Sequence, residues 1–201
     1  MNVLARKARA ALRTAQRARA HLPLLAVALA MSACSLLPAQ TMPEPPPLLT
    51  PASLERTVSV LQIVHGAFHE RDLVFQCVVD VDPQRLSIVG LSAQGQRWFS
   101  LRDDGRGLEA ESTVQAPGVL DPRRVVADLQ LALWPLAALQ NAFAGSAWEV
   151  SQPAPATRRL RRQGRLISEV RYASADPWQG TLWLSNFESG YALTIESRPL
   201  Q

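Results

Sequence analysis

The sequence lacks an apolar run long enough to cross a bilayer. The run near its N-terminus, Leu22 to Met31, has ten residues and contains Pro23, whereas a membrane-spanning helix needs about 20 apolar residues. Acidic residues are absent before Glu44, and the same stretch carries six cations, all before Leu22. A cationic segment, a short apolar segment and small residues follow one another, which is the order of a secretory signal peptide.

The residues after the apolar run make this signal more specific. Met31-Ser32-Ala33-Cys34 resembles the bacterial lipobox, in which the cysteine is lipidated and becomes the first residue of the mature chain. More than one acyl chain on that residue makes physical sense, because a single chain anchors a protein only marginally. We therefore predict a lipoprotein signal peptide over residues 1–33 and lipidation of Cys34. The alternatives are a mitochondrial presequence and an ordinary signal peptide in which Cys34 is incidental.

Processing at this position changes the charge balance. Removing the six cations of the signal peptide from the total of 21 leaves 15, all arginine, against 17 acids, a formal charge of −2. The basic total therefore belongs mostly to the signal peptide and does not indicate nucleic-acid attraction. No motif of a nucleic-acid-binding module is present, and we expect no nucleic-acid partner.

Cysteine is scarce as well, with two residues in the chain. If Cys34 carries lipid, Cys77 has no cysteine left to pair with, so an intramolecular disulfide is excluded. Cys77 shares its parity with the apolar residues of the segment 73–81, and a strand would turn all of them to one face. We expect Cys77 to be a small buried apolar side chain rather than a reactive thiol.

Proline is concentrated between the lipidation site and the first strand pattern. The segment 35–51 holds six prolines in seventeen residues, which indicates an extended, semi-rigid spacer. We assign residues 34–51 to a lipidated tether and residues 52–201 to a single domain. Ser35 stands where an aspartate would signal inner-membrane retention, so we expect anchoring to the outer membrane, facing the periplasm.

Short strand patterns separated by turn residues dominate the domain. Apolar alternation rich in β-branched and aromatic residues occurs at 56–68, 71–81, 85–92, 96–102, 164–172, 180–187 and 191–197. The intervening turns are marked by Asp82-Pro83, Gln94-Gly95, Asp104-Gly105, Gln163-Gly164 and Ser189-Gly190. Connections this short join antiparallel neighbours, so the fold class is mainly β with an antiparallel meander.

One segment has helical spacing instead. Asp121 and Pro122 suit an N-cap and the first helical position, and apolar residues then recur at Val125, Leu129 and Leu133. We expect that stripe to face the sheet and Arg124 and Asp128 to pair on the wet face. Pro135 stops or kinks the helix at Trp134, and a second short helix is expected to end near Gly145.

Several of these segments resemble an uncharacterised family of bacterial lipoproteins with a domain of unknown function. The resemblance rests on DLQLALWPLAAL (128–139), GLSAQGQRWFSLR (90–102), the turn 177–180 and NFESGYAL (186–193). It implies an association with aryl polyene or related fatty-acid-type biosynthesis. It also implies a fold similar to LolA and LolB, an open half-barrel covered by a kinked helix. The exposed apolar loop tip of LolB has no match here, so receptor activity is not implied.

Motifs of catalysis are missing. His65 and His69 are four residues apart beside Glu70 and Asp72, but the surrounding residues favour a strand end and turn, where this spacing does not build a metal site. We expect solvent-facing turn histidines, with no metal and no cofactor. The sequence has no nucleophile elbow or phosphate loop, so we predict that the protein is not an enzyme.

Arginines cluster in the segment 157–165 around a Gln-Gly turn. Arg159 and Arg161 would share one strand face, and their guanidinium groups suit phosphate or carboxylate. They are our candidates for contacts to an anionic group. The alternative is a charged edge hairpin that opposes sheet aggregation.

Aromatic residues either fill a core or line a pocket for an apolar ligand. The residues that we predict to contact a ligand are Trp134, Phe143, Phe99, Trp183 and Tyr191, with Trp134 at the mouth of a cavity. Two functions remain open. The protein either binds or delivers an acyl- or polyene-type lipid or a lipoprotein acyl chain, or it is a ligand-free interaction protein with a partner in the cell envelope.

Overall fold

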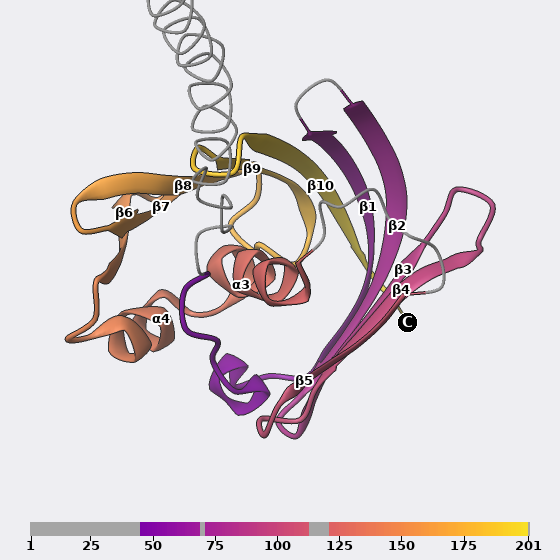
Figure 1. Cartoon of the computed structure of the whole chain (residues 1–201), viewed down its shortest axis with the longest axis horizontal. Helices are drawn as coiled ribbons and strands as arrows, with labels where there is room; N and C mark the ends of the chain where they lie inside the picture. The colour runs from indigo at the N-terminus through magenta and orange to yellow at the C-terminus, as the bar shows by residue number, and fades with distance from the viewer. Residues whose placement is uncertain (1–44, 69–70, 113–120, 201) are drawn as a thin grey trace, which may run out of the picture. The chain divides into compact units, whose positions relative to one another are not determined.

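A computed structural model describes residues 45–68, 71–112 and 121–200 (Figure 1). Cys34, the signal peptide and most of the tether lie outside these residues. The elements before the helices are η2 (Pro51–Leu54), β1 (Val58–Phe68), β2 (Arg71–Asp82), β3 (Arg85–Leu91), β4 (Arg97–Asp103) and β5 (Leu108–Ser112). Then come α3 (Pro122–Leu133), α4 (Leu136–Phe143), β6 (Trp148–Ala154), β7 (Thr157–Arg162), β8 (Arg165–Tyr172), β9 (Gly180–Asn186) and β10 (Tyr191–Pro199).

The strands form one antiparallel ten-stranded sheet in the order β5-β4-β3-β2-β1-β10-β9-β8-β7-β6. Two five-strand meanders, one on each side of the helices in sequence, join through the pairing of β1 with β10. Among the described residues, β5 and β6 are the two outer strands and do not pair with each other, so the sheet is open. The predicted antiparallel, mainly β fold is confirmed.

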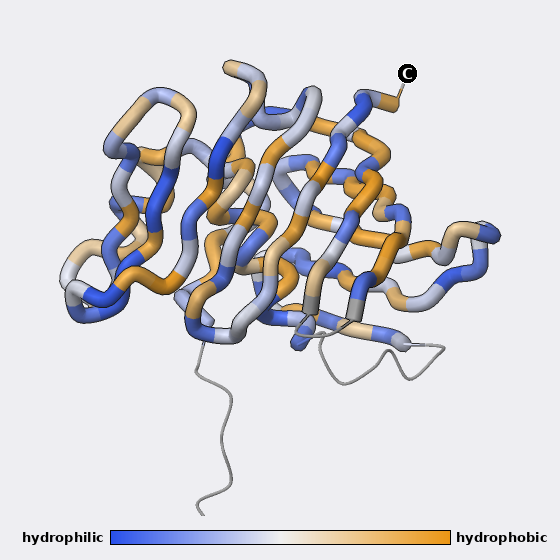
Figure 2. Tube along the Cα trace, turned by 90° about the horizontal axis from the view of Figure 1, so that it is seen from above, coloured by the Kyte–Doolittle hydropathy of each residue, from blue (hydrophilic) through white to orange (hydrophobic). Residues whose placement is uncertain are grey.

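Period-two alternation decides which side chains reach the core. In β3, Leu86 and Ile88 are buried, whereas Arg85 is exposed and Ser87 and Val89 are half-buried. Figure 2 shows the same alternation of apolar and polar residues along many strands. Phe75, Cys77 and Val79 of β2 are buried together, as their shared parity predicted. The sheet curves, and Figure 1 shows α3 on its concave side.

The ends of α3 follow from local residues. The Asp121 side chain accepts a hydrogen bond from the Arg123 backbone N–H at 3.0 Å, and Pro122 occupies the first turn. The helix ends at Leu133, before Pro135, and α4 begins one residue later. This kinked pair of helices was predicted, and Leu133 is buried as expected.

The prediction that Arg124 and Asp128 lie on a solvent-exposed face of α3 is wrong. Arg124 is only 6% exposed, and Asp128 is half-buried against the sheet side. A spacing of four residues shows that two side chains share a helix face, but not whether that face meets water. Here buried residues, Arg124 and Gln130 among them, lie on more of the helix surface than the stripe of Val125, Leu129 and Leu133 indicated.

The domain also begins earlier than the tether assignment placed it. Leu49 is buried, and its backbone N–H and C=O are both bonded by the side-chain amide of Gln130, at 2.9 and 2.7 Å. Ser53 accepts a hydrogen bond from the Trp134 indole N–H at 3.0 Å. The segment 49–54 therefore packs on α3 and is part of the folded unit.

Candidate ligand cavity

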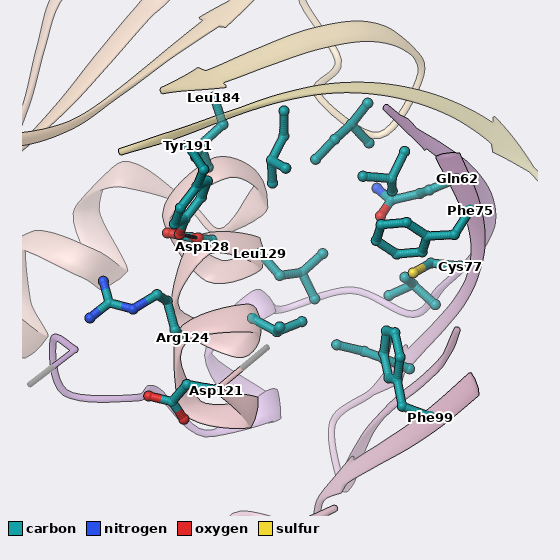
Figure 3. Close-up of a pocket in the computed structure, with 16 residues that line it drawn as sticks. Gln62, Phe75, Cys77, Phe99, Asp121, Arg124, Asp128, Leu129, Leu184 and Tyr191 are labelled. Carbon is teal, nitrogen blue, oxygen red and sulfur yellow. Dashed lines mark hydrogen bonds between the residues drawn. The ribbon is translucent and has the colours of Figure 1, made fainter. Parts of the chain in front are cut away.

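An apolar cavity of about 80 Å³ lies between α3 and the inner face of the sheet. Val125 and Leu129 line it from the helix. The opposing wall includes Val64, Phe75, Cys77, Val79, Ile88, Phe99, Leu184, Leu193 and Ile195 from six strands. Figure 3 shows Phe75, Cys77 and Phe99 pointing from the strands toward the helix. Residues of β1 and of β10, far apart in the sequence, meet at this wall.

Aromatic rings form one end of the cavity wall. The Phe75 and Phe99 rings meet edge to face with centroids 6.2 Å apart, and Trp98 lies 6.1 Å from Phe75. The Phe99 ring occupies the space where a side chain on Gly90 would begin, since a Cβ there would lie 2.2 Å from the ring. Gly90 therefore leaves the space that the Phe99 ring fills at this end of the wall.

Cys77 contributes a thiol to the wall. It is the free cysteine among the described residues and is buried. Burial without a charged partner raises the pKa of the thiol to about 12, so the thiolate is scarce at neutral pH. The side chain acts as an apolar wall residue, as its strand pattern predicted.

Polar groups meet at the side of the cavity where α3 approaches β10. The Tyr191 hydroxyl donates a hydrogen bond to the Asp128 carboxylate and accepts one from the Asn186 amide at 3.2 Å. Burial raises the pKa of Asp128 to about 6, opposed by the Tyr191 hydrogen bond and the charge of Arg124. Burial, together with the Asp128 charge, raises the pKa of Tyr191 as well. These bonds hold α3 to the sheet beside the cavity.

The C-terminal end of α3 is held by a cation from β7. Buried Arg158 donates hydrogen bonds to the carbonyl oxygens of Leu131 and Trp134, at 2.6 and 2.9 Å. Cations stabilise helix C-termini because the last carbonyls lack partners within the helix. The Tyr172 hydroxyl donates to the carbonyl of Ala132 at 2.8 Å, so β7 and β8 both position the helix.

A family model described as "Protein of unknown function (DUF3261)" matches residues 59–199, from the start of β1 to the end of β10. The chain belongs to this family. The match covers more than half of the chain and confirms the predicted membership of a family of unknown function.

Among solved structures, the chain is similar to the LolA superfamily protein NE2245 from Nitrosomonas europaea, with 12% identity and a TM-score of 0.44. The likeness covers 76% of this chain and 90% of that one. No curated protein matches the chain.

The structure of this DUF3261 protein separates the five predicted ligand-contact aromatics. Phe99 and Tyr191 line the cavity. Phe143 is buried in the core, and Trp183 is 39% exposed on the outer face of β9, because the alternate residues Leu182 and Leu184 turn inward. Phe75 lines the cavity too, and its shared parity with Cys77 could have placed it there.

The prediction that Trp134 lies at the mouth of the cavity is wrong. Trp134 is 1% exposed, packs on Trp178 with centroids 6.3 Å apart, and does not line the cavity. The Pro135 break therefore places Trp134 in the core rather than at a mouth. Removing it should cost stability, about 3–5 kcal/mol for a buried tryptophan.

The arginines of the segment 157–165 bond to different partners within the chain. Arg159 pairs with Glu169 at 2.8 Å, and Arg161 donates to the carbonyl of Gly164 at 2.9 Å. Both predicted anion contacts thus have partners within the chain. The alternative of an edge hairpin is wrong, because β6 lies outside β7. Arg158, which no pattern singled out, is the member that acts on the helix.

The described part of the chain has no group of three or more His, Cys, Asp or Glu side chains placed to hold a metal ion. His65 is exposed within β1 rather than in a turn, and His69 lies outside the described residues. None of the helices in the described ranges has the length and hydropathy of a membrane-spanning segment.

Proposed function

We propose that this protein is a lipid-anchored periplasmic lipoprotein of the outer membrane that binds a hydrophobic ligand between α3 and the concave face of the sheet. The observation that carries the proposal is the apolar cavity itself, walled by six strands and one helix. The lipobox-like residues 31–34 support the anchor, and the resemblance in sequence supports an acyl- or polyene-type chain, or a lipoprotein acyl group, as ligand.

The cavity volume indicates how binding would proceed. Pockets that enclose small molecules measure about 300–1,000 Å³, whereas this cavity measures about 80 Å³. A chain of several methylene groups therefore requires α3 to move away from the sheet. In this proposal α3 and α4 are the cover of an open half-barrel.

A movement of α3 would have to break specific contacts. Tyr191, Arg158 and Tyr172 bond the helix from the strands, and the Leu49 backbone bonds its Gln130 side chain. The cavity side of the helix offers Val125 and Leu129, which give apolar contact area without directional bonds. Binding of an apolar chain would replace the contacts of Val125 and Leu129 with equivalent contacts to the ligand. Such binding involves no chemical reaction and suits transport or storage.

Ligand binding can be tested on the full chain with Cys34→Ser, which removes the lipidation site. We expect native mass spectrometry to show a co-purified lipid, and the uncharged probe N-phenyl-1-naphthylamine to bind saturably. Leu129→Phe or Val125→Trp fills the cavity from the helix and should weaken probe binding at least tenfold. Ala142→Phe, at an exposed position of α4, is the matched control and should leave binding unchanged.

The competing function is a ligand-free interaction protein of the envelope. The exposed apolar side chains Val74 and Trp183 on the outer face of the sheet, and Phe187 in the β9–β10 turn, favour it. A protein without co-purified lipid and without saturable probe binding would support this alternative and refute the carrier.

A further inference from the structure

One cross-strand row of the inner face differs from its neighbours. The strand register aligns Phe99, Gly90, Cys77, Gln62 and Ser197 across β4, β3, β2, β1 and β10. Directly opposed residues on one sheet face have adjoining side chains. An amide and a hydroxyl therefore stand beside one another on the inner face of the sheet, and the amide of Gln62 lines the cavity.

Gln62 presents the amide of this row to the cavity. It is 3% exposed and lines the cavity, and Figure 3 shows it projecting from β1 beside Phe75 toward α3. Its amide nitrogen donates to the Ser197 hydroxyl at 3.0 Å, and within the described ranges this is the one hydrogen bond of the side chain. A primary amide has two N–H donors and a carbonyl oxygen with two lone pairs, so most of its capacity is unused.

The amide oxygen of Gln62 borders the open space of the cavity, since it is not among the fully enclosed side-chain atoms of the described residues that lack a hydrogen-bond partner. Taking such a group out of water without a compensating hydrogen bond costs free energy, and leucine or valine would fill the same place at no such cost. The neighbouring inward positions of β1, Val60 and Val64, are apolar. A ligand that supplies a donor or an acceptor at this point would offset the cost of Gln62.

From this row we infer that the cavity takes an apolar chain bearing an uncharged hydrogen-bonding group, a hydroxyl, ester or amide, which binds the Gln62 amide. The inference rests on the proposed function and names the chemical class of its ligand. Gln62 and Ser197 are both neutral, whereas the charged lining residues are Asp121, which caps α3, and Arg124 and Asp128 of α3, across the cavity.

The position of Gln62 makes it a fixed contact. β1 pairs with β2 on one side and with β10 on the other, so Gln62 stays in place when α3 moves. A group bound there would set how deep the chain enters, which a purely apolar wall does not determine.

The experiment uses the Cys34→Ser chain and four competitors of one chain length, delivered from cyclodextrin at pH 8. Dodecane, 1-dodecanol, methyl dodecanoate and dodecanoate each displace N-phenyl-1-naphthylamine. Gln62→Leu should weaken the alcohol and the ester about three- to tenfold, the effect of one net hydrogen bond, and should leave dodecane within about twofold. The parent should bind 1-dodecanol more tightly than dodecanoate.

The control is Gln76→Leu, which makes the same change on β2 at a half-buried position of opposite parity to Cys77; it should alter no affinity. Gln62→Met, which keeps an unbranched side chain, repeats the test if Gln62→Leu unfolds. Equal changes for dodecane and dodecanol, no change for either, or tighter binding of dodecanoate would overturn this inference alone. Failure of all four competitors to displace the probe, or of the probe to bind, would overturn the proposed function with it.

Discussion

The guanidinium of Arg158 is buried against the last turn of α3, where carbonyl groups lack partners within the helix. It also lies over the Tyr172 ring, 5.7 Å from the ring centroid. Burial lowers the pKa of this guanidinium, but arginine remains charged in proteins. One residue of β7 thus connects the second meander of the sheet to the helix beside the cavity.

We expect Arg158→Met to lower the free energy of unfolding by about 2–4 kcal/mol, because buried hydrogen bonds to a charged group are lost and two helix carbonyls are left unpaired. Urea denaturation measures this value. Arg159→Met is the matched control on the neighbouring residue, whose partly exposed pair with Glu169 should contribute about 1 kcal/mol or less. Equal losses for the two variants would show that Arg158 does not cap the helix.

Asp128 should make the free energy of unfolding fall as the pH rises, which is opposite to the usual effect of a carboxylate. Its pKa is raised to about 6 in the folded chain from an ordinary 3.8, so the folded state binds the proton more tightly than the unfolded state. The stabilisation is present below pH 4 and is lost as the pH rises toward 6, an effect of about 1–3 kcal/mol. We expect the unfolding free energy of the parent to fall by this amount relative to Asp128→Asn between pH 4 and pH 7.

Denaturation at intervals of one pH unit gives the difference between the two proteins. The asparagine variant keeps an oxygen that can accept from Tyr191, so the comparison isolates the charge. A difference that is flat across this range, or that rises with pH, would contradict the burial of this carboxylate.

Sequence reasoning at single positions succeeded where one periodicity decides the outcome. The parity of β2 placed Phe75, Cys77 and Val79 on one buried face, since a strand has only two faces. It failed for Arg124 and Arg158, whose burial depends on which residues of other strands and helices surround them. Trp134 failed for the same reason, because a proline break shows where a helix stops but not what packs over its end.

Between elements, the approach of β4 to β3 depends on the missing side chain of Gly90. The strand register shifts between Gly90 and Leu91, and the Phe99 ring fills the space beside Gly90. Gly90→Ala should therefore displace the ring and destabilise the fold by about 1–3 kcal/mol, as overpacking does. Thermal or urea unfolding measures the loss.

Two comparisons make the Gly90 experiment specific. Gly107 has open space around the position of a Cβ, so Gly107→Ala should be nearly neutral. Adding Phe99→Leu to Gly90→Ala should recover part of the loss, because the shorter side chain leaves room. A double variant whose loss equals the sum of the two single losses would show that the ring and the glycine do not interact.

Element positions were predicted best where their signals are local. Asp121, Pro122 and Pro135 fixed the kinked helices, and turn residues fixed most hairpins. β5 and β6 were missed because each outer strand pairs with a neighbour on one side and carries mostly exposed side chains. Their sequences therefore lack the apolar alternation that marks the other strands. The packing of Leu49 on Gln130 was missed because proline-rich composition indicates extension, whether or not the extended chain is docked.

For the whole molecule, the anchor is the part that sequence alone supports, since Cys34 lies outside the described residues. We expect the native chain to partition with membranes and to incorporate labelled palmitate, and the Cys34→Ser chain to remain soluble or unprocessed. Fractionation and labelling of the two expressed chains measure this. Equal membrane partitioning without label on the native chain would exclude the lipoprotein anchor.

The location of a bound chain decides whether the cavity is the binding site. The measurement is photo-crosslinking of the Cys34→Ser chain with a long-chain alcohol that carries an alkyl diazirine, followed by residue-level mapping of the adducts by tandem mass spectrometry. We predict adducts on inward residues, Phe75, Cys77, Phe99 and Leu129, and their loss on competition with unlabelled 1-dodecanol. Val74 and Trp183 point outward from β2 and β9, next to the inward residues Phe75 and Leu184. Adducts confined to these two outward residues would contradict a ligand cavity between α3 and the sheet.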